Sequence, residues 1–200
     1  MKRILHLISS PRGDQSFSIK LGNAVISKIQ DQYPGSTVEV VNLVERNVPH
    51  LDTAHLRSFF TPAEQLTPED QDAVKYSDEA ISQLMAADII VIGAPLYNFS
   101  IHSTLKAWID HIARAGKTFR YSEQGVEGLV KGKKVYVAMS SGGVYSDGPY
   151  KPYDFVSTYL KAVLGFLGMT DLTVFRVEGI NIPGLKESAL EKGIAAINIE

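Results

Sequence analysis

The stretch from Asp88 to Pro95 constrains the fold more than any other part of the chain. Its centre, Ile89-Ile90-Val91-Ile92, is apolar at four consecutive positions. A strand that is apolar at both odd and even positions buries both faces, as central strands of helix-covered parallel sheets do. Parallel neighbours need long crossover connections, usually helices, so the rest of the chain should alternate strands with helices.

That alternation runs along the whole sequence. Further strands are predicted at residues 3–8, 37–43, 134–140 and 172–177, and helices at 17–32, 67–87, 103–115, 155–167 and 186–199. Residues 44–66 show no clear period, and a small hairpin is predicted within 118–130. Right-handed crossovers then give a doubly wound α/β sheet of five strands in the flavodoxin-like order 2-1-3-4-5. We expect one domain, residues 1–200, because no boundary is visible.

Composition excludes several function classes. Twenty Lys and Arg against 22 Asp and Glu give a net charge of −2, whereas nucleic-acid binders usually show a basic excess. No apolar run reaches the length of a membrane span, and the apolar run after Arg3 is too short for a signal peptide, so we expect no membrane partner and a cytoplasmic protein. The chain has no Cys, which removes thiol nucleophiles and cysteine-ligated metals. The five His lack metal-ligand spacing, so no metal is expected.

In a doubly wound sheet, ligands bind beyond the carboxyl ends of the strands, where the strand order reverses. The loop after the first strand carries Ser10, Ser16 and Ser18 beside Phe17 and leads into a helix. Hydroxyls and the free N–H groups of a helix N-terminus together make an anion site. Simple capping of the helix is the alternative.

Two more loops reach the same edge. After the third strand, Pro95 and Leu96 precede Tyr97, Asn98 and Phe99. The two aromatic rings offer flat walls for a ring system, or they only pack on the next helix.

The loop after the fourth strand reads Ser140-Ser141-Gly142-Gly143. Its glycines permit close backbone approach, so N–H groups can converge on an acceptor; a flexible turn is the alternative. These three loops at one predicted edge favour a mononucleotide site over a dinucleotide site, because G-x-G-x-x-G and the P-loop pattern are missing.

Several segments resemble one family along essentially the whole chain. They are Ser10, Ser16-Phe17-Ser18, Ala94-Pro95-Leu96-Tyr97-Asn98-Phe99, Arg114-Ala115-Gly116-Lys117-Thr118-Phe119-Arg120-Tyr121, Glu127-Gly128-Leu129-Val130, Ser141-Gly142-Gly143 and Gly165-Phe166-Leu167-Gly168-Met169-Thr170-Asp171. This combination is similar to the FMN-dependent NADH-azoreductase and quinone-reductase family.

The resemblance implies a homodimer with one FMN per subunit and active sites at the dimer interface. Members pass two electrons from NADH or NADPH to a quinone or an aromatic azo compound, which suggests a ping-pong mechanism. It assigns Ser10, Ser16, Phe17 and Ser18 to the phosphate, Leu96, Tyr97, Asn98 and Phe99 after Pro95 to the isoalloxazine, and Ser140, Ser141, Gly142 and Gly143 to the pyrimidine edge.

The flavin carries the chemistry in such proteins, so no dedicated catalytic residue is expected. The pocket candidates are Asn98, Gly142 and Gly143, with Phe119 and Tyr121 as walls that a partner subunit supplies, or as residues that only stabilise the hairpin. The family often has Arg at the position of Ser141 and His at that of Tyr145, which puts side-chain roles there, and the substrate range, in question.

Three other functions remain open at this level. A flavodoxin-type electron carrier has the same fold and cofactor, but such carriers are typically shorter and more acidic. A hydrolase, such as an acyl-carrier-protein phosphodiesterase, needs a nucleophile with a base or a metal, and the sequence shows neither G-x-S-x-G nor metal spacing. A regulatory domain on the same fold is the third, since fold does not fix function.

Overall fold

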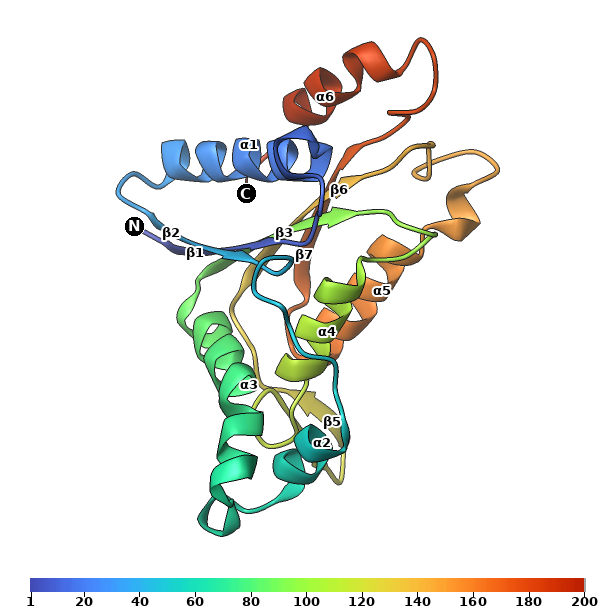
Figure 1. Ribbon diagram of the computed structural model, residues 1–200. Helices are drawn as coiled ribbons and strands as arrows, with labels where there is room; N and C mark the ends of the chain where they lie inside the picture. The colour runs from blue at the N-terminus through green and yellow to red at the C-terminus, as the bar shows by residue number, and fades with distance from the viewer. Residues whose placement is uncertain (200) are drawn as a thin grey trace.

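The computed structural model describes residues 1–199 and shows alternating strands and helices (Figure 1). The elements are β1 (Arg3–Ile8), η1 (Gly13–Gln15), α1 (Phe17–Gln32), β2 (Thr37–Asn42), α2 (Thr53–Phe60), η2 (Ala63–Gln65), α3 (Pro68–Ala86), β3 (Ile89–Pro95), α4 (Ser103–Ile112), β4 (Phe119–Ser122), β5 (Gly125–Gly128), β6 (Lys134–Ser140), η3 (Lys151–Tyr153), α5 (Phe155–Phe166), β7 (Asp171–Val177) and α6 (Lys186–Ala195).

The main sheet has five parallel strands in the order β2-β1-β3-β6-β7. The sequence predicted the order 2-1-3-4-5, which counts main-sheet strands alone; the labels differ because β4 and β5, a separate antiparallel hairpin, fall between β3 and β6 in the chain. The carboxyl ends of β1, β3, β6 and β7 therefore meet at one edge of the sheet.

Helices cover both faces of this sheet. Figure 1 shows α1 and α6 on one face, and α3, α4 and α5 on the other. The core beneath α1 includes Leu21, Val25 and Ile29, which recur at helical spacing and are buried. The opposite core includes Trp108 of α4 and Leu160 of α5. Every residue of β3 is buried, as its unbroken apolar run predicted.

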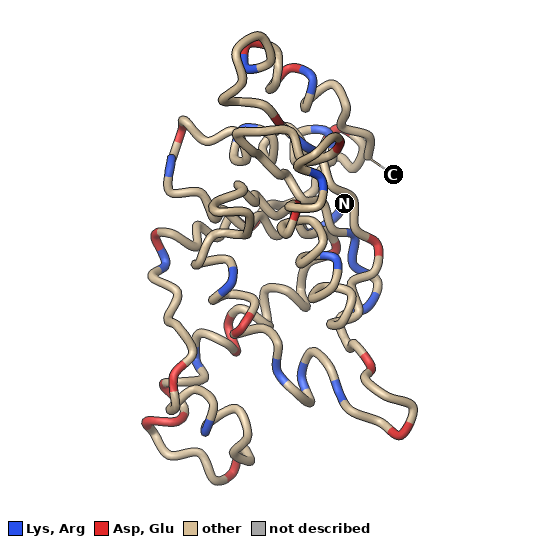
Figure 2. The backbone as a smooth tube through the Cα atoms, turned by 90° about the vertical axis from the view of Figure 1, so that its right-hand side faces the viewer, with Lys and Arg blue, Asp and Glu red and all other residues tan. Residues whose placement is uncertain are grey.

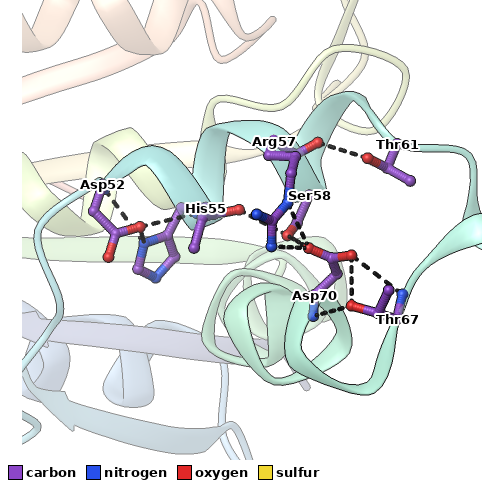
Figure 3. A network of polar contacts seen from close by, with 8 residues as sticks. Asp52, His55, Arg57, Ser58, Thr61, Thr67 and Asp70 are labelled. Carbon is purple, nitrogen blue, oxygen red and sulfur yellow. Dashed lines mark hydrogen bonds and ion pairs between the residues drawn. The ribbon is translucent and has the colours of Figure 1, made fainter.

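The segment without a clear period contains a helix that sequence periodicity missed. Asp52 caps α2, because its carboxylate accepts a hydrogen bond from the backbone N–H of His55 (3.0 Å) and lies 2.6 Å from His55 Nδ1. The helix then packs on the start of α3, where Asp70 accepts from Arg57 Nη2 (2.7 Å) and Ser58 Oγ (3.0 Å) (Figure 3). These polar contacts replace the wide apolar stripe that would have revealed the helix in the sequence.

Smaller differences concern element ends. Helix α4 ends at Ile112 rather than at residue 115, because Ala113 leaves helical geometry and Thr118 Oγ1 donates to the carbonyls of Ile112 and Arg114. Helix α6 ends at Ala195 rather than at residue 199.

Charges of both signs are interspersed along the chain, as Figure 2 shows for its Lys and Arg and its Asp and Glu. Within residues 1–199, no helix is both long and apolar enough to cross a membrane. The same residues contain no cluster of three or more His, Asp or Glu that could hold a metal ion.

Candidate functional site

Four loops meet at the carboxyl edge of the main sheet and enclose a cavity of about 190 Å³. The loops follow β1, β3, β6 and β7. The lining residues are Ser10, Arg12, Ser16, Phe17, Pro95, Leu96, Tyr97, Ser140, Ser141, Gly142, Ile180 and Asn181. The three loops selected from the sequence thus come together in one place.

The loop after β1 brings serine hydroxyls to the N-terminus of α1. Ser10 and Ser16 are buried, although both line the cavity. Ser16 caps the helix, since its Oγ accepts from the N–H of Ile19 (3.4 Å) and lies 3.0 Å from Ser18 Oγ. The first N–H groups of a helix have no intrahelical acceptor, and the helix dipole favours negative charge there. This end of the cavity therefore suits an anion.

The loop after β3 is a tight turn. Tyr97 and Ser100 exchange two backbone hydrogen bonds, each 2.9 Å long. The two residues between them, Asn98 and Phe99, have φ values of 48° and 68°. Bulky residues rarely adopt positive φ, and such strain clusters at ligand sites. The N–H of Leu96 donates to the carbonyl of Ser140 (2.8 Å), so this turn is tied to the next loop.

The loop after β6 is paired with the loop after β7. The carbonyls of Ser141 and Gly142 accept from the N–H groups of Ile180 (3.3 Å) and Asn181 (3.0 Å). A Cβ on Gly142 would lie 2.5 Å from Asn181 Nδ2. A side chain at position 142 would therefore displace the amide of Asn181, which glycine allows to approach the loop closely.

A second, larger cavity of about 670 Å³ adjoins the first at Tyr97, which lines both. Its other lining residues are Pro11, Asn98, Ser100, Ile101, His102, Ser103, Lys106 and Tyr159. Burial lowers the pKa of His102 and raises that of Tyr159. Both side chains are therefore neutral at pH 7, whereas Lys106 pairs with Asp110 at 2.5 Å.

The expected site residues divide by position. Ser10, Ser16, Phe17, Pro95, Leu96, Tyr97, Ser140, Ser141 and Gly142 line the smaller cavity, and Asn98 lines the larger one. Ser18 is fully buried behind Ser16. Phe99 and Gly143 lie beside the cavities and line neither.

Phe119 and Tyr121 lie in the β4–β5 hairpin, which packs on the last turn of α5 at the opposite edge of the sheet. There, Phe119 contacts Phe166 with ring centroids 4.7 Å apart. Within one chain, neither Phe119 nor Tyr121 lines the cavities. Their expected role as pocket walls thus depends on a second copy of the chain.

The loop after β7 was missed in the sequence, although Ile180 and Asn181 line the smaller cavity. The sequence did contain a signal for this loop: the strand at residues 172–177 was predicted to belong to the parallel sheet. Because the carboxyl ends of parallel strands share one edge, the loop after this strand was expected near the other three. Arg12 also lines this cavity.

This arrangement, with an anion end, an apolar aromatic turn and a glycine loop at the switch edge of a doubly wound sheet, defines the flavodoxin-like class. The chain matches the family described as having a flavodoxin-like fold over residues 2–198. A solved azoreductase from Bacillus anthracis superposes with a TM-score of 0.90 at 31% identity, covering 98% of this chain and 96% of that one.

Related proteins indicate a narrower class than the flavodoxin-like fold. A protein of Paraburkholderia phymatum named FMN-dependent NADH:quinone oxidoreductase is 49% identical over 198 residues, which cover 98% of each chain. One of the same name from Agrobacterium fabrum is 45% identical and covers 98% of this chain and 94% of its own. A Bacillus anthracis FMN-dependent NADH-azoreductase solved in complex with FMN has a TM-score of 0.86 at 31% identity, over 98% of this chain and 97% of that one. The chain belongs to this family of FMN-dependent NADH:quinone oxidoreductases and azoreductases.

Proposed function

We propose that this protein is an FMN-dependent oxidoreductase that transfers two electrons from NADH to quinones and aromatic azo compounds. The observation that carries the proposal is the cavity in which Ser10, Tyr97 and Gly142 meet from three different loops. The names of the relatives supply the reaction class.

The residues present fit FMN by their chemistry. The cavity has buried hydroxyls beside a helix N-terminus for a phosphate, and Leu96 and Tyr97 for an apolar ring. When bound, FMN would supply the two-electron chemistry. Ser10 and Ser16 would donate hydrogen bonds to the phosphate, and Arg12 would add a positive charge at the same end.

The glycine loop would stabilise negative charge on the ring. The carbonyls of Gly142 and Gly143 accept from the loop after β7, and we propose their N–H groups as donors to the ligand. A fixed donor aimed at developing charge contributes about 3 kcal/mol in well-studied sites. Asn98, held by the tight turn after β3, would lie at the reacting edge.

We propose that nicotinamide and acceptor bind in turn at the same cavity. Such alternate binding implies ping-pong kinetics, and NADPH would be an alternative donor. We also propose a homodimer in which the exposed hairpin residue Tyr121, beside Phe119, faces the partner's site. We also propose a cytoplasmic location, because no apolar run in the sequence reaches the length of a membrane span.

The first test is an anaerobic absorbance spectrum of the purified protein before and after NADH. We expect flavin bands that bleach in one two-electron step and return when a quinone is added. Bleaching in two separate one-electron steps would support the electron carrier instead. A colourless protein that takes up no added FMN would overturn the proposal.

A pair of serine variants tests the phosphate end. Ser10→Ala removes a cavity hydroxyl, and Ser27→Ala removes an exposed hydroxyl on α1 as the matched control. A hydrogen bond to a charged group contributes about 1.5–3 kcal/mol, so the Kd for FMN should rise at least about ten-fold in Ser10→Ala. Fluorescence titration of the apoprotein measures this, and equal Kd values in both variants would contradict the assignment.

A further inference from the structure

Aromatic side chains from α2, α3 and α4 meet in one cluster. His111 of α4 lies at its centre and is fully buried. Its ring contacts those of His55 and Tyr76 edge to face, each with ring centroids 5.0 Å apart. Phe59 also contacts this ring, at 6.1 Å. Because His55 and Phe59 lie on α2, His111 forms part of the surface on which α2 rests.

The hydrogen bonding of His111 fixes which ring nitrogen carries its hydrogen. Nε2 lies 2.9 Å from the backbone carbonyl oxygen of Pro49. A carbonyl can only accept, so Nε2 is the nitrogen that donates. Nδ1 is buried and has no hydrogen-bond partner among residues 1–199. A proton added at Nδ1 would therefore have no acceptor, and an unpaired buried charge is costly.

Nearby cations also oppose a second proton on the ring of His111. The guanidinium of Arg114, just after α4, lies 4.5 Å from the centroid of the Phe59 ring, which itself contacts His111. Arg114 is only 7% exposed, so solvent screens its charge weakly. A protonated His55 would add another cation beside the same ring. These surroundings hold His111 in its neutral form.

The carboxylates beside the cluster already have partners of their own. The pairs are Asp52 with His55 Nδ1 (2.6 Å), Asp78 with Arg114 (2.6 Å) and Asp110 with Lys106 (2.5 Å). Tyr76 is the remaining titratable group, and burial raises its pKa to about 12. Burial lowers the pKa of His111, and the hydrogen bond to Pro49 offsets this effect only in part.

A second contact of α2 does not respond to the same pH. Asp70 of α3 accepts from Arg57 Nη2 and Ser58 Oγ (Figure 3). Hydrogen bonds from Thr67 and Arg57 hold the pKa of Asp70 well below its ordinary value. This carboxylate is ionised at pH 5, so Arg57 and Ser58 keep α2 tethered to α3 there.

We propose that His111 is a pH-sensitive clasp for α2: acidification adds a proton at Nδ1, the rings of His55 and Phe59 leave the cluster, and the helix opens while still tethered at Asp70. A helix of eight residues is marginal in water by itself. Once released from the cluster, α2 therefore loses its backbone hydrogen bonds. This inference goes beyond the proposed function and does not depend on it.

The direction of the pH effect follows from proton linkage. In the open form His111 has its ordinary pKa of 6.5, and in the closed form its pKa is lower. The clasp is therefore complete above pH 6.5 and weakens as pH falls from 6.5 towards the pKa of the closed form. One proton linked in this way makes opening about ten-fold more favourable at pH 5 than at pH 7.

Hydrogen exchange of the full chain, measured by mass spectrometry at pH 7 and pH 5, tests the opening. After correction for the pH dependence of chemical exchange, residues 56–60 should exchange about ten-fold faster at pH 5. At both pH values they should exchange faster than β3, which reports global unfolding. Exchange at residues 56–60 that is independent of pH, or that occurs at the rate of β3, would overturn the clasp.

A pair of histidine variants tests the assignment to His111. His111→Leu removes the titrating ring and keeps an apolar side chain in the cluster, so the pH dependence at residues 56–60 should disappear. His50→Leu is the matched control, because His50 is exposed and directly follows Pro49, and it should keep the wild-type pH dependence. If His111→Leu fails to fold, His111→Gln keeps a donor for Pro49 without titrating. Wild-type pH dependence in a folded His111 variant would contradict the proposal.

Nitrogen NMR of the histidine rings gives a readout that does not rely on exchange. The His111 signal is assigned by its absence in the folded His111 variant. At pH 7 it should show the hydrogen on Nε2, and it should titrate over the pH range in which residues 56–60 open. A hydrogen on Nδ1 at pH 7, or a ring that stays neutral after α2 has opened, would refute the inference.

Discussion

His6 lies in the middle of β1 and faces α1. It is 1% exposed, and its Nε2 is buried without a hydrogen-bond partner among the described residues. A Cβ on Gly22 of α1 would lie 2.9 Å from that atom, so the ring occupies the space that glycine leaves. Burial lowers the pKa of His6 to about 4. The folded protein therefore holds this ring in its neutral form.

The pH dependence of stability follows from this pKa. Because the folded pKa lies below the ordinary value of 6.5, the stabilisation is complete above pH 6.5 and is lost as pH falls from 6.5 to about 4. The shift corresponds to about 3 kcal/mol. His6→Val should remove most of this loss, measured by urea unfolding at pH 7 and pH 4.5. Equal losses in both proteins would contradict the prediction.

Two glycines near α5 should respond oppositely to substitution by alanine. A Cβ on Gly128 would lie 2.2 Å from the backbone N of Gly168, whereas a Cβ on Gly165 meets nothing within 4 Å. Gly128→Ala should destabilise the protein by about 1–3 kcal/mol or more, because the hairpin must move off α5. Gly165→Ala should stabilise it by about 0.5–1 kcal/mol. Thermal unfolding of both variants checks the contrast, and a shift of the same sign in both would refute it.

At the scale of elements, the junction of α2 and α3 depends on polar contacts. Thr67 caps α3, since its Oγ1 accepts from the N–H of Asp70 (3.2 Å) and donates to Asp70 Oδ2 (2.7 Å) (Figure 3). Hydrogen bonds from the side chains of Thr67 and Arg57 hold the pKa of Asp70 well below its ordinary value. Asp70 therefore stays ionised far into the acidic range, and its contacts are lost only when pH falls through this low pKa.

Removing the Thr67 cap of α3 should lower the free energy of unfolding more than removing an exposed hydroxyl elsewhere does. Thr67→Ala should lower the free energy of unfolding by about 1 kcal/mol. Thr61 is the matched control, because its exposed hydroxyl only donates to the carbonyl of Arg57 (2.8 Å), and Thr61→Ala should change stability by less than about 0.5 kcal/mol. Urea unfolding at pH 7 measures both. Equal effects would show that the cap contributes nothing.

The elements also show what sequence alone could predict. The main strands and most helices followed from apolar runs and periodicity, as in β3 and α1. Helix α2 was missed, because its caps and its contacts with α3 hold it rather than a wide apolar stripe. In the site, Ser16, Tyr97 and Gly142 were predictable from loop position. The position of β7 indicated the loop that carries Asn181, but which residue of that loop reaches the cavity depends on its pairing with the glycine loop.

At the scale of the whole molecule, ligand binding should raise stability. FMN at 100 times its Kd would stabilise the folded state by about 2.7 kcal/mol, which corresponds to a rise in Tm of about 5–10 °C for a chain of this size. Riboflavin at the same concentration should raise Tm less, because it lacks the phosphate. Calorimetric scans of the apoprotein measure both, and equal shifts would show that the end of the cavity at Ser10 and Ser16 does not bind the phosphate.

Two of the four site loops extend from β3 and β6, whose interior residues are buried, and this has a consequence for local opening. β3 and β6 pair on both sides within the sheet, so their amides should exchange with solvent only through global unfolding. Pro95 and Ser140, which line the smaller cavity, are the last residues of these two strands. The cavity therefore adjoins the part of the fold that opens last. Fraying that begins at α2 or at the hairpin would leave the site assembled, and loss of the site would coincide with loss of the fold itself.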